Sequence, residues 1–333
     1  MGRRNWPCGS CGLWRRHRGT RPGNIPTDVA CDRRDRPRWV QVSGAQAHAR
    51  SLPAMIVMAS PAPQLRPGWR KAANRALRLA VALPRAGAAR LLAATEHSAR
   101  FSGAYNSSAA LTPALARFKT RGYDDESVVD VSFDEMCRRE TWDYPILFWL
   151  GRYLPDLPFV LDAGGHLGTK YIAFSDLINL SGAHWTVHDL PGIVRAARAR
   201  QNRGELPAAI TFEDRLDQTP ATDILLVSGF LPYLDIPFSE FVAALRRRPK
   251  VILLNKVAVR DGAEIFTIER IGSARVPYRI RNRSQWESRI SAMGYEMLDS
   301  WNISEIGHVI PTHPWLGRSK SRGYALLRRD EIE

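Results

Sequence analysis

An acidic residue followed closely by three glycines, in the stretch Asp162-Ala-Gly164-Gly165-His166-Leu-Gly168, has the residue types that most directly indicate ligand chemistry. The apolar run that precedes it, beginning at Phe159, is typical of a buried strand, and the segment that follows reads as a helix. A glycine-rich turn between a strand and a helix can bring backbone N–H groups close to a ligand. This turn is therefore the first candidate for a binding site.

The acid decides which ligand the turn favours. The dinucleotide-binding pattern Gly-x-Gly-x-x-Gly, aligned on Gly168, needs a glycine at the position that Ala163 occupies. A carboxylate at Asp162 would repel a pyrophosphate, whereas it would attract the ammonium group of an amino acid. The stretch is closer to the Asp-x-Gly-x-Gly-x-Gly turn of S-adenosylmethionine enzymes, with His166 in place of the middle glycine. His166 could cap the helix or contact the carboxylate of that cofactor.

Further polar residues follow the next three apolar runs. Asp189 ends the second run, where an acid can accept hydrogen bonds from both hydroxyls of a ribose. Asp214 follows the third run and could accept a hydrogen bond from an adenine amine, and the segment from Ser228 to Tyr233 leaves the fourth run. Each acid alone is more often a cap or turn residue than a ligand. In this order along the chain, the residues together predict a nucleoside site.

The elements that would position these residues are five short apolar runs, separated mostly by helix-length segments. They cover residues 159–162, 185–189, 210–212, 223–228 and 251–255. Strands that alternate with helices predict an α/β fold with a parallel, doubly wound sheet, whose ligands bind at the carboxyl ends of the strands. Residues 295–301 and 323–328, joined by a loop, add a terminal antiparallel hairpin, which makes seven strands.

The segment 266–284 is expected to be irregular. Arg279, Arg281 and Arg283 alternate in it as one face of an extended chain would. They could bind a phosphate or carboxylate of a substrate, although a solvated edge strand is the simpler interpretation.

The net charge of +15 belongs to the N-terminal part of the chain. Residues 1–100 hold 19 Lys and Arg against 4 Asp and Glu, whereas residues 101–333 hold 29 of each. The rest of the chain is therefore neutral, and no nucleic-acid partner is expected. Residues 1–54 are rich in Arg and free of Lys, and we expect a disordered tail that could even lie upstream of the true start. The alternative is a basic tail that contacts nucleic acid or an acidic membrane surface.

The cysteines and the apolar runs bear on the compartment. Cys8, Cys11 and Cys31 lie in the tail, where one Cys-x-x-Cys pair is too little for a four-ligand zinc site, and no metal is expected. Cys137 stands alone in the body and cannot form an internal disulfide there, which fits a reducing, cytoplasmic compartment. No apolar run reaches 18 residues, so no membrane span is expected.

The chain is expected to divide into three parts. After the tail of residues 1–54, residues 55–157 are expected to form a helical cap with aromatic anchors, and residues 158–330 to form the sheet domain.

Several of these stretches together resemble a family of S-adenosylmethionine-dependent methyltransferases often associated with bacterial surface-polysaccharide biosynthesis. The resemblance is carried by Val160–Tyr171, Trp185–Pro191, Leu225–Leu234 and Gly294–Glu296, and by Phe101–Ser107 and Gly122–Asp124 nearer the start. It implies a class I methyltransferase-like (Rossmann-like) sheet, with the cofactor on Asp162 to Gly168, Asp189 and the adjacent Leu190. It also implies a small-molecule or saccharide acceptor. Ala163, Pro232 and Glu269 depart from the family's pattern.

Methyl transfer from a sulfonium chiefly requires that acceptor and methyl be held in line, which can supply about 7–11 kcal/mol at best. A hydroxyl acceptor also needs a general base. Glu269, Tyr278, His308 and His313 lie in the segments after the fourth apolar run, and each alone is more often structural. We take His308 and Glu269 as the candidates for this base. Two alternatives to a methyltransferase remain: an NAD-dependent oxidoreductase on the same sheet, and a catalytically inactive nucleoside-binding scaffold in glycan assembly.

Overall fold

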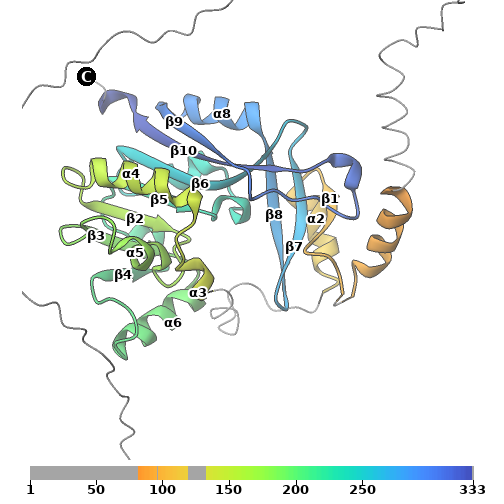
Figure 1. Cartoon of the computed structure of the whole chain (residues 1–333), viewed down its shortest axis with the longest axis horizontal. Helices are drawn as coiled ribbons and strands as arrows, with labels where there is room; N and C mark the ends of the chain where they lie inside the picture. Colours follow the sequence, from red (N-terminus) through yellow and green to blue (C-terminus); the bar gives the residue numbers. More distant parts are fainter. Residues whose placement is uncertain (1–81, 96, 119–132, 332–333) are drawn as a thin grey trace, which may run out of the picture. The chain divides into compact units, whose positions relative to one another are not determined.

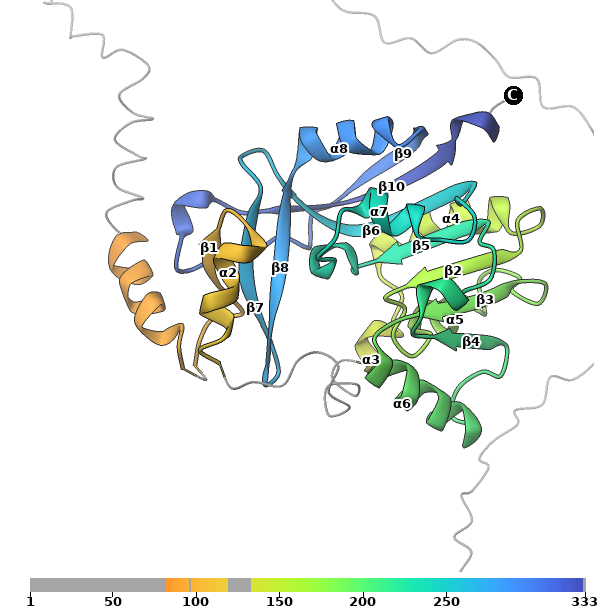
Figure 2. The same cartoon turned by 180° about the vertical axis from the view of Figure 1, so that it is seen from behind.

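The computed structural model describes residues 82–95, 97–118 and 133–331 (Figures 1 and 2). The basic tail with its three cysteines and the stretch Gly122–Asp124 lie outside these ranges. None of the helices described is both long enough and apolar enough to cross a membrane. The described chain is built on one ten-stranded sheet. Its strands are β1 (Phe101–Tyr105), β2 (Phe159–Ala163), β3 (His184–His188), β4 (Ile210–Glu213), β5 (Ile224–Ser228), β6 (Val251–Arg260), β7 (Ile265–Ile271), β8 (Ala274–Asn282), β9 (Tyr295–Ile303) and β10 (Lys320–Arg328).

Five neighbouring strands in the order β4-β3-β2-β5-β6 form the parallel half of the sheet. Strand β10 pairs antiparallel with β6 and with β9, so the last two strands form an antiparallel hairpin. The expected class I methyltransferase-like sheet of seven strands with a terminal antiparallel hairpin is confirmed in these strands. Strands β1, β7 and β8 extend the sheet beyond that expectation.

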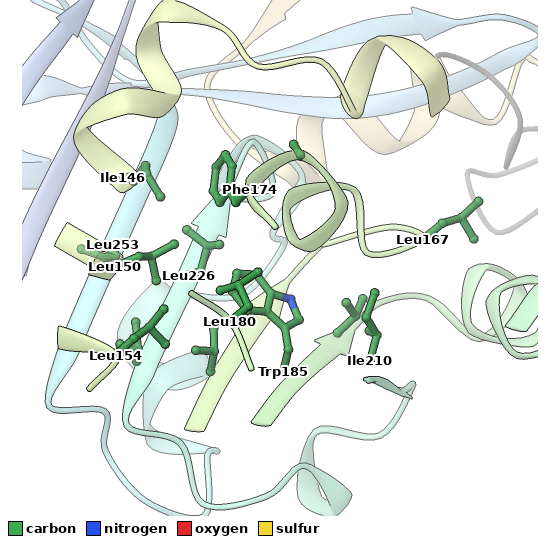
Figure 3. Close-up of a cluster of buried hydrophobic side chains, with 14 of the residues drawn as sticks. Ile146, Leu150, Leu154, Leu167, Phe174, Leu180, Trp185, Ile210, Leu226 and Leu253 are labelled. Carbon is green, nitrogen blue, oxygen red and sulfur yellow. The ribbon is translucent and has the colours of Figure 1, made fainter. Parts of the chain in front are cut away.

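Each face of the parallel strands has its own apolar core, because alternate residues of a strand point to opposite faces. Val160, Leu226 and Leu253 pack with the helices α4 (Tyr144–Tyr153), α5 (Thr169–Phe174) and α6 (Pro191–Asn202), as Figure 3 shows for part of this cluster. Leu161 and Leu225 belong to the second cluster, with the helices α7 (Phe238–Ala243) and α8 (Arg283–Ala292). Strands that are buried on both faces read as continuous apolar runs, which is why these strands could be located from the sequence.

Helices and short 3-10 turns connect the strands. The bounds are α2 (Ser108–Leu115), α3 (Phe133–Met136), α4 (Tyr144–Tyr153), α5 (Thr169–Phe174), α6 (Pro191–Asn202), α7 (Phe238–Ala243) and α8 (Arg283–Ala292), with short 3-10 turns η2 (Thr141–Asp143), η3 (Leu216–Gln218), η4 (Leu231–Tyr233), η5 (Pro314–Leu316) and η6 (Arg329–Glu331). Residues 82–92 are helical as well. Part of the segment expected as a helical cap is instead the strand β1, which pairs antiparallel with β7.

The expectation of an irregular segment over 266–284 is wrong. Strands β7 and β8 form a regular antiparallel hairpin, and β8 also pairs with the end of β6. Strand β8 is therefore an interior strand rather than a solvated edge. Arg281 is 2% exposed, donates a hydrogen bond to the Leu231 carbonyl at 2.8 Å and lies over the ring of Trp286, whereas Arg279 pairs with Glu264.

Candidate functional site

The glycine turn connects β2 to α5 and has a left-handed backbone at three alternate residues. The angle φ is +72° at Gly164, +56° at His166 and +78° at Gly168. A Cβ atom at Gly164 would lie 2.6 Å from the Phe230 side chain, and one at Gly168 would lie 2.5 Å from Ile210. Both glycines are thus required by conformation and by space. His166 occupies the left-handed position of the middle glycine, at a conformational cost of about 1–2 kcal/mol.

Asp162 is buried beneath this turn. Its side chain is 1% exposed, and neither carboxylate oxygen has a hydrogen-bond partner among the described residues. Burial raises the pKa of Asp162 to about 7. Lys170 and the nearby Trp185 indole, whose N–H falls short of hydrogen-bond geometry, oppose this rise in part, and the charge of Asp189 adds to it. Buried polar groups in native proteins are nearly always paired, so this carboxyl indicates a partner that the described residues do not supply.

Gly165 makes room for that carboxylate. A Cβ atom at position 165 would lie 2.5 Å from Oδ2 of Asp162. The variant Gly165→Ala is therefore expected to lower the free energy of unfolding by roughly 1–3 kcal/mol, because either the turn or the carboxyl must move. Urea unfolding followed by circular dichroism measures this change. Gly182→Ala is the matched control, since nothing lies within 4 Å of a Cβ there. Equal stabilities for the two variants would contradict the close packing of the turn on Asp162.

Asp189 follows β3 and fixes the glycine turn to the end of that strand. Its Oδ2 accepts a hydrogen bond from the backbone N–H of His166 at 2.9 Å, and its Oδ1 accepts one from the N–H of Leu190 at 2.8 Å. The backbone N–H of Gly164 donates to the carbonyl of His188 at 2.8 Å. Asp189 is only half-buried, and a carboxylate has about four acceptor sites. The acid is therefore held in place beside the glycine turn.

Asp214 and Ser228 lie at the same edge of the sheet. Strands β2, β3, β4 and β5 run parallel, so the residues at their carboxyl ends, Asp162, Asp189, Asp214 and Ser228, come to one edge as the sequence predicted. Asp214 is half-buried. The hydroxyl oxygen of Ser228 is buried and has no hydrogen-bond partner among the described residues. The edge thus carries two buried polar groups, Asp162 and Ser228, without a partner there.

A cavity of about 600 Å³ lies beside the end of β5, the middle of β6 and the strand β8. Gly229, Tyr233, Lys256, Tyr278 and His308 are among its lining residues. Four of the lining residues are Arg or Lys and three are Glu, so the wall is polar with nearly balanced charge. The volume is within the range of small-molecule sites. In the part of the chain that the structure describes, no group of three His, Cys, Asp or Glu residues could hold a metal ion.

Glu269, one of the two candidate catalysts, is engaged in two interactions. Its side chain is fully buried, its Oε1 accepts a hydrogen bond from Nε of Arg100 at 2.7 Å, and its Oε2 accepts one from the Tyr233 hydroxyl at 2.7 Å. Burial raises the pKa of Glu269, which Tyr233 and Arg100 oppose. Tyr233, predicted as a cofactor residue, is thus joined to β7 and lines the cavity.

His308, the other candidate, lines the cavity with its ring between two aromatic side chains. The ring centroids lie 4.4 Å from Phe101 and 5.8 Å from Tyr278. Burial, together with the charges of Arg100 and Arg318, lowers the pKa of His308 to about 4. The imidazole is therefore uncharged at neutral pH, and it is a weak base.

A buried ion pair supports the region between the turn and the cavity. Lys170, on α5, donates to both carboxylate oxygens of Asp143 at 2.9 Å, and the side chains are 7% and 1% exposed. Asn255 of β6 donates to Asp143 at 3.3 Å and accepts from the Trp301 indole at 3.3 Å. These residues are far apart in the sequence and form no motif, so sequence reasoning missed them.

Sequence reasoning also missed Lys256, which lines the cavity from β6. Its backbone is left-handed, with φ at +58°. Burial lowers the pKa of Lys256 to about 8, aided by the charge of Lys170 and opposed by Asp143 and Glu140. The signal that could have found it is a single charged residue between the apolar stretches Val251–Leu254 and Val257–Val259 of one strand.

No protein-family model and no curated protein matches this chain. Solved structures similar to it include the 1,6-didemethyltoxoflavin-N1-methyltransferase of Burkholderia thailandensis, at 18% identity over 61% of this chain and 86% of that chain, with a TM-score of 0.40. The glycopeptide N-methyltransferase MtfA is 16% identical over 55% of this chain and 94% of its own, with a TM-score of 0.38. The magnesium protoporphyrin IX methyltransferase ChlM of Synechocystis PCC 6803 is 15% identical over 65% and 82%, with a TM-score of 0.35. Similarity at this level supports no conclusion about the reaction or substrate of this chain.

Proposed function

We propose that this chain is an S-adenosylmethionine-dependent methyltransferase that transfers a methyl group to an oxygen of a small-molecule or glycan acceptor. The observation that carries the proposal is Asp162, a buried carboxyl without a donor, directly beneath a glycine turn whose backbone Asp189 holds. A carboxylate in this place favours a ligand with a cationic end over one with a pyrophosphate. The sequence resemblance to a methyltransferase family points the same way.

The residues at this edge fit the cofactor by their chemistry. Asp162 and the turn Gly164–Gly168 would take its amino-acid end, where Gly165 leaves room for the Asp162 carboxylate beneath the turn. Asp189, beside Leu190, would accept hydrogen bonds from the ribose, and Asp214 would accept one from the adenine amine. Ser228, with its buried hydroxyl, would supply a further hydrogen bond. When bound, the cofactor supplies a methyl group on a sulfonium, which is already activated for transfer.

The acceptor in this proposal is a polar molecule in the cavity beside β5 and β6. The nearly balanced charge of the wall and the volume of about 600 Å³ suit a saccharide or another small hydroxylated molecule. A role in polysaccharide biosynthesis in the cytoplasm fits the resemblance and the single cysteine of the body.

Calorimetric titration of the purified chain with S-adenosylmethionine, S-adenosylhomocysteine and NAD tests the proposal. We expect both adenosyl compounds to bind and NAD not to bind. Binding of NAD alone would overturn the proposal in favour of an oxidoreductase. A folded protein that binds none of the three would favour a scaffold without methyltransferase activity.

Replacement of Asp189 by alanine is expected to weaken S-adenosylhomocysteine binding about 10- to 100-fold. The variant removes an acceptor for the ribose and also frees the N–H of His166, and hydrogen bonds to a charged group contribute about 1.5–3 kcal/mol. Titration calorimetry measures the change, with circular dichroism to verify folding. Asp235→Ala, an exposed acid, serves as the control. Unchanged affinity in a folded Asp189→Ala variant would mean that the nucleoside binds elsewhere.

A further inference from the structure

Lys256 lies at a bulge of β6, beyond the residues that pair with β5. Asn255 and Lys256 together face Gly323 of β10, where the register of the two strands shifts. The left-handed backbone of Lys256 costs a residue other than glycine about 1–2 kcal/mol. Conformations of this kind persist only where the surrounding structure holds them, and they concentrate at functional sites. The bulge changes the direction of one side chain in an otherwise apolar strand.

That side chain extends into the cavity. Its Nζ lies 6.0 Å from the centre of the Trp142 ring, and no hydrogen bond or ion pair joins the Lys256 side chain to another residue in the described ranges. Its Cδ would contact a Cβ atom at Gly229, at 3.6 Å. Gly229 directly follows Ser228. The Lys256 side chain therefore lies next to the end of β5, which we assign to the cofactor.

The charged surroundings of Lys256 come from several elements. The nearest groups are Lys170 of α5, which disfavours the ammonium form, and Asp143 and Glu140, which favour it. The other titratable groups that face the cavity include Arg100. The remaining ones are Glu135 of α3, Arg138 just after that helix, Tyr233 of η4, Tyr278 of β8, and Glu305 and His308. With burial as the largest cause, the pKa of Lys256 falls to about 8, so the neutral amine makes up about a tenth of the population at pH 7 and about half at pH 8.

We propose that Lys256 is the general base of the methyl transfer and that its Nζ takes the proton of an acceptor hydroxyl in the cavity. This inference rests on the proposed function. The hydroxyl oxygen forms its bond to the methyl carbon as the sulfur–carbon bond breaks with its electron pair on sulfur, and the hydroxyl proton moves to the neutral Nζ. The products are a methyl ether and an ammonium group, which then returns its proton to water. A general base works best when its pKa lies near the working pH.

The two candidates from the sequence and the second lysine of the cavity are less suited to this role. The carboxylate of Glu269 is occupied by Arg100 and Tyr233, and Lys170 is bound to Asp143. The pKa of His308, at about 4, makes its imidazole a weaker base than Lys256. The geometry thus points to Lys256 rather than to the two candidates from the sequence.

Trace acetylation of the whole protein with acetic anhydride, followed by mass spectrometry between pH 6 and pH 11, tests the state of the amine without an acceptor. Lys250, half-buried at the other end of β6 and paired with Glu331, is the internal control. We expect the acetylation of Lys256 to be half-maximal near pH 8. Acetylation of the two lysines in parallel, or no acetylation of Lys256 below pH 11, would overturn the proposal.

Calorimetry on the variants Lys256→Met and Lys250→Met separates this proposal from the proposed function. Both variants are expected to bind S-adenosylhomocysteine within about threefold of the wild type. A loss of more than tenfold in a folded Lys256→Met would place the residue in the cofactor site and overturn its role as a base. If the wild type itself does not bind S-adenosylhomocysteine, the proposed function fails and the catalytic role fails with it, whatever the titration of Lys256.

Discussion

The variant Asp162→Asn is expected to be more stable than the wild type by about 1–3 kcal/mol at pH 8 in the absence of ligand, and to lose S-adenosylmethionine binding. The pKa of Asp162 is about 7 in the folded protein and near 4 in an unfolded chain. Ionising this buried carboxyl above pH 7 therefore costs the folded state up to about 4 kcal/mol, of which an amide without partners recovers a part. The wild type keeps a destabilising acid that only a bound cation or donor would compensate.

The sign of the pH dependence follows from this shift. The folded state holds a proton that the unfolded state has lost between about pH 4 and pH 7, so this group makes the wild type less stable as the pH rises through that range. Urea unfolding should give equal stabilities for wild type and Asp162→Asn near pH 5, and a difference that is fully developed by pH 8. The exposed substitution Asp235→Asn is the control, with an effect below about 0.5 kcal/mol. A variant less stable than the wild type at pH 8 would contradict this account, as would retained affinity for S-adenosylmethionine.

The variant Asp143→Ala is expected to destabilise the protein by about 3–5 kcal/mol, the largest loss that we predict. It leaves the buried ammonium of Lys170 without its partner and removes an acceptor from Asn255. The free energy of unfolding from urea titration measures the loss.

A double variant separates the charge from the packing at this site. Asp143→Leu combined with Lys170→Met removes both charges and keeps most of the volume, and it should recover all but about 1–2 kcal/mol of the loss. A loss below 1 kcal/mol in Asp143→Ala, or a double variant no more stable than that single variant, would show that the ion pair is not buried as described.

The parallel strands could be located from the sequence because burial on both faces leaves apolar runs that contain no competing pattern. The strands β7 and β8 could not, for a physical reason visible in their residues. Arg275, Pro277, Arg279 and Arg281 make this segment look polar and interrupted. Arg281 is nevertheless buried, because its guanidinium reaches the Leu231 carbonyl, 50 residues earlier in the chain, and the Trp286 ring on the helix that follows β8. Local pattern does not reveal partners of this kind.

In the candidate site, too, some features follow from the local sequence and others depend on distant parts of the chain. The order Asp162, Asp189, Asp214 and Ser228 follows from strand order alone, and the left-handed position of His166 follows from the spacing of the glycines. The bulge at Lys256 depends on how β6 pairs with β10, which the sequence of β6 does not encode by itself. The site residues at the carboxyl ends of β2 to β5 were therefore predictable from the sequence, whereas the residues that line the cavity were not.

A crystal structure of the protein with S-adenosylhomocysteine tests the central claim most directly. The account predicts density for the ligand at the carboxyl ends of β2 to β5, with the amino-acid end at the turn Gly164–Gly168 and the ribose hydroxyls on the carboxylate of Asp189. Density for the nucleoside at any other edge of the sheet, with the glycine turn left uncovered, would contradict it.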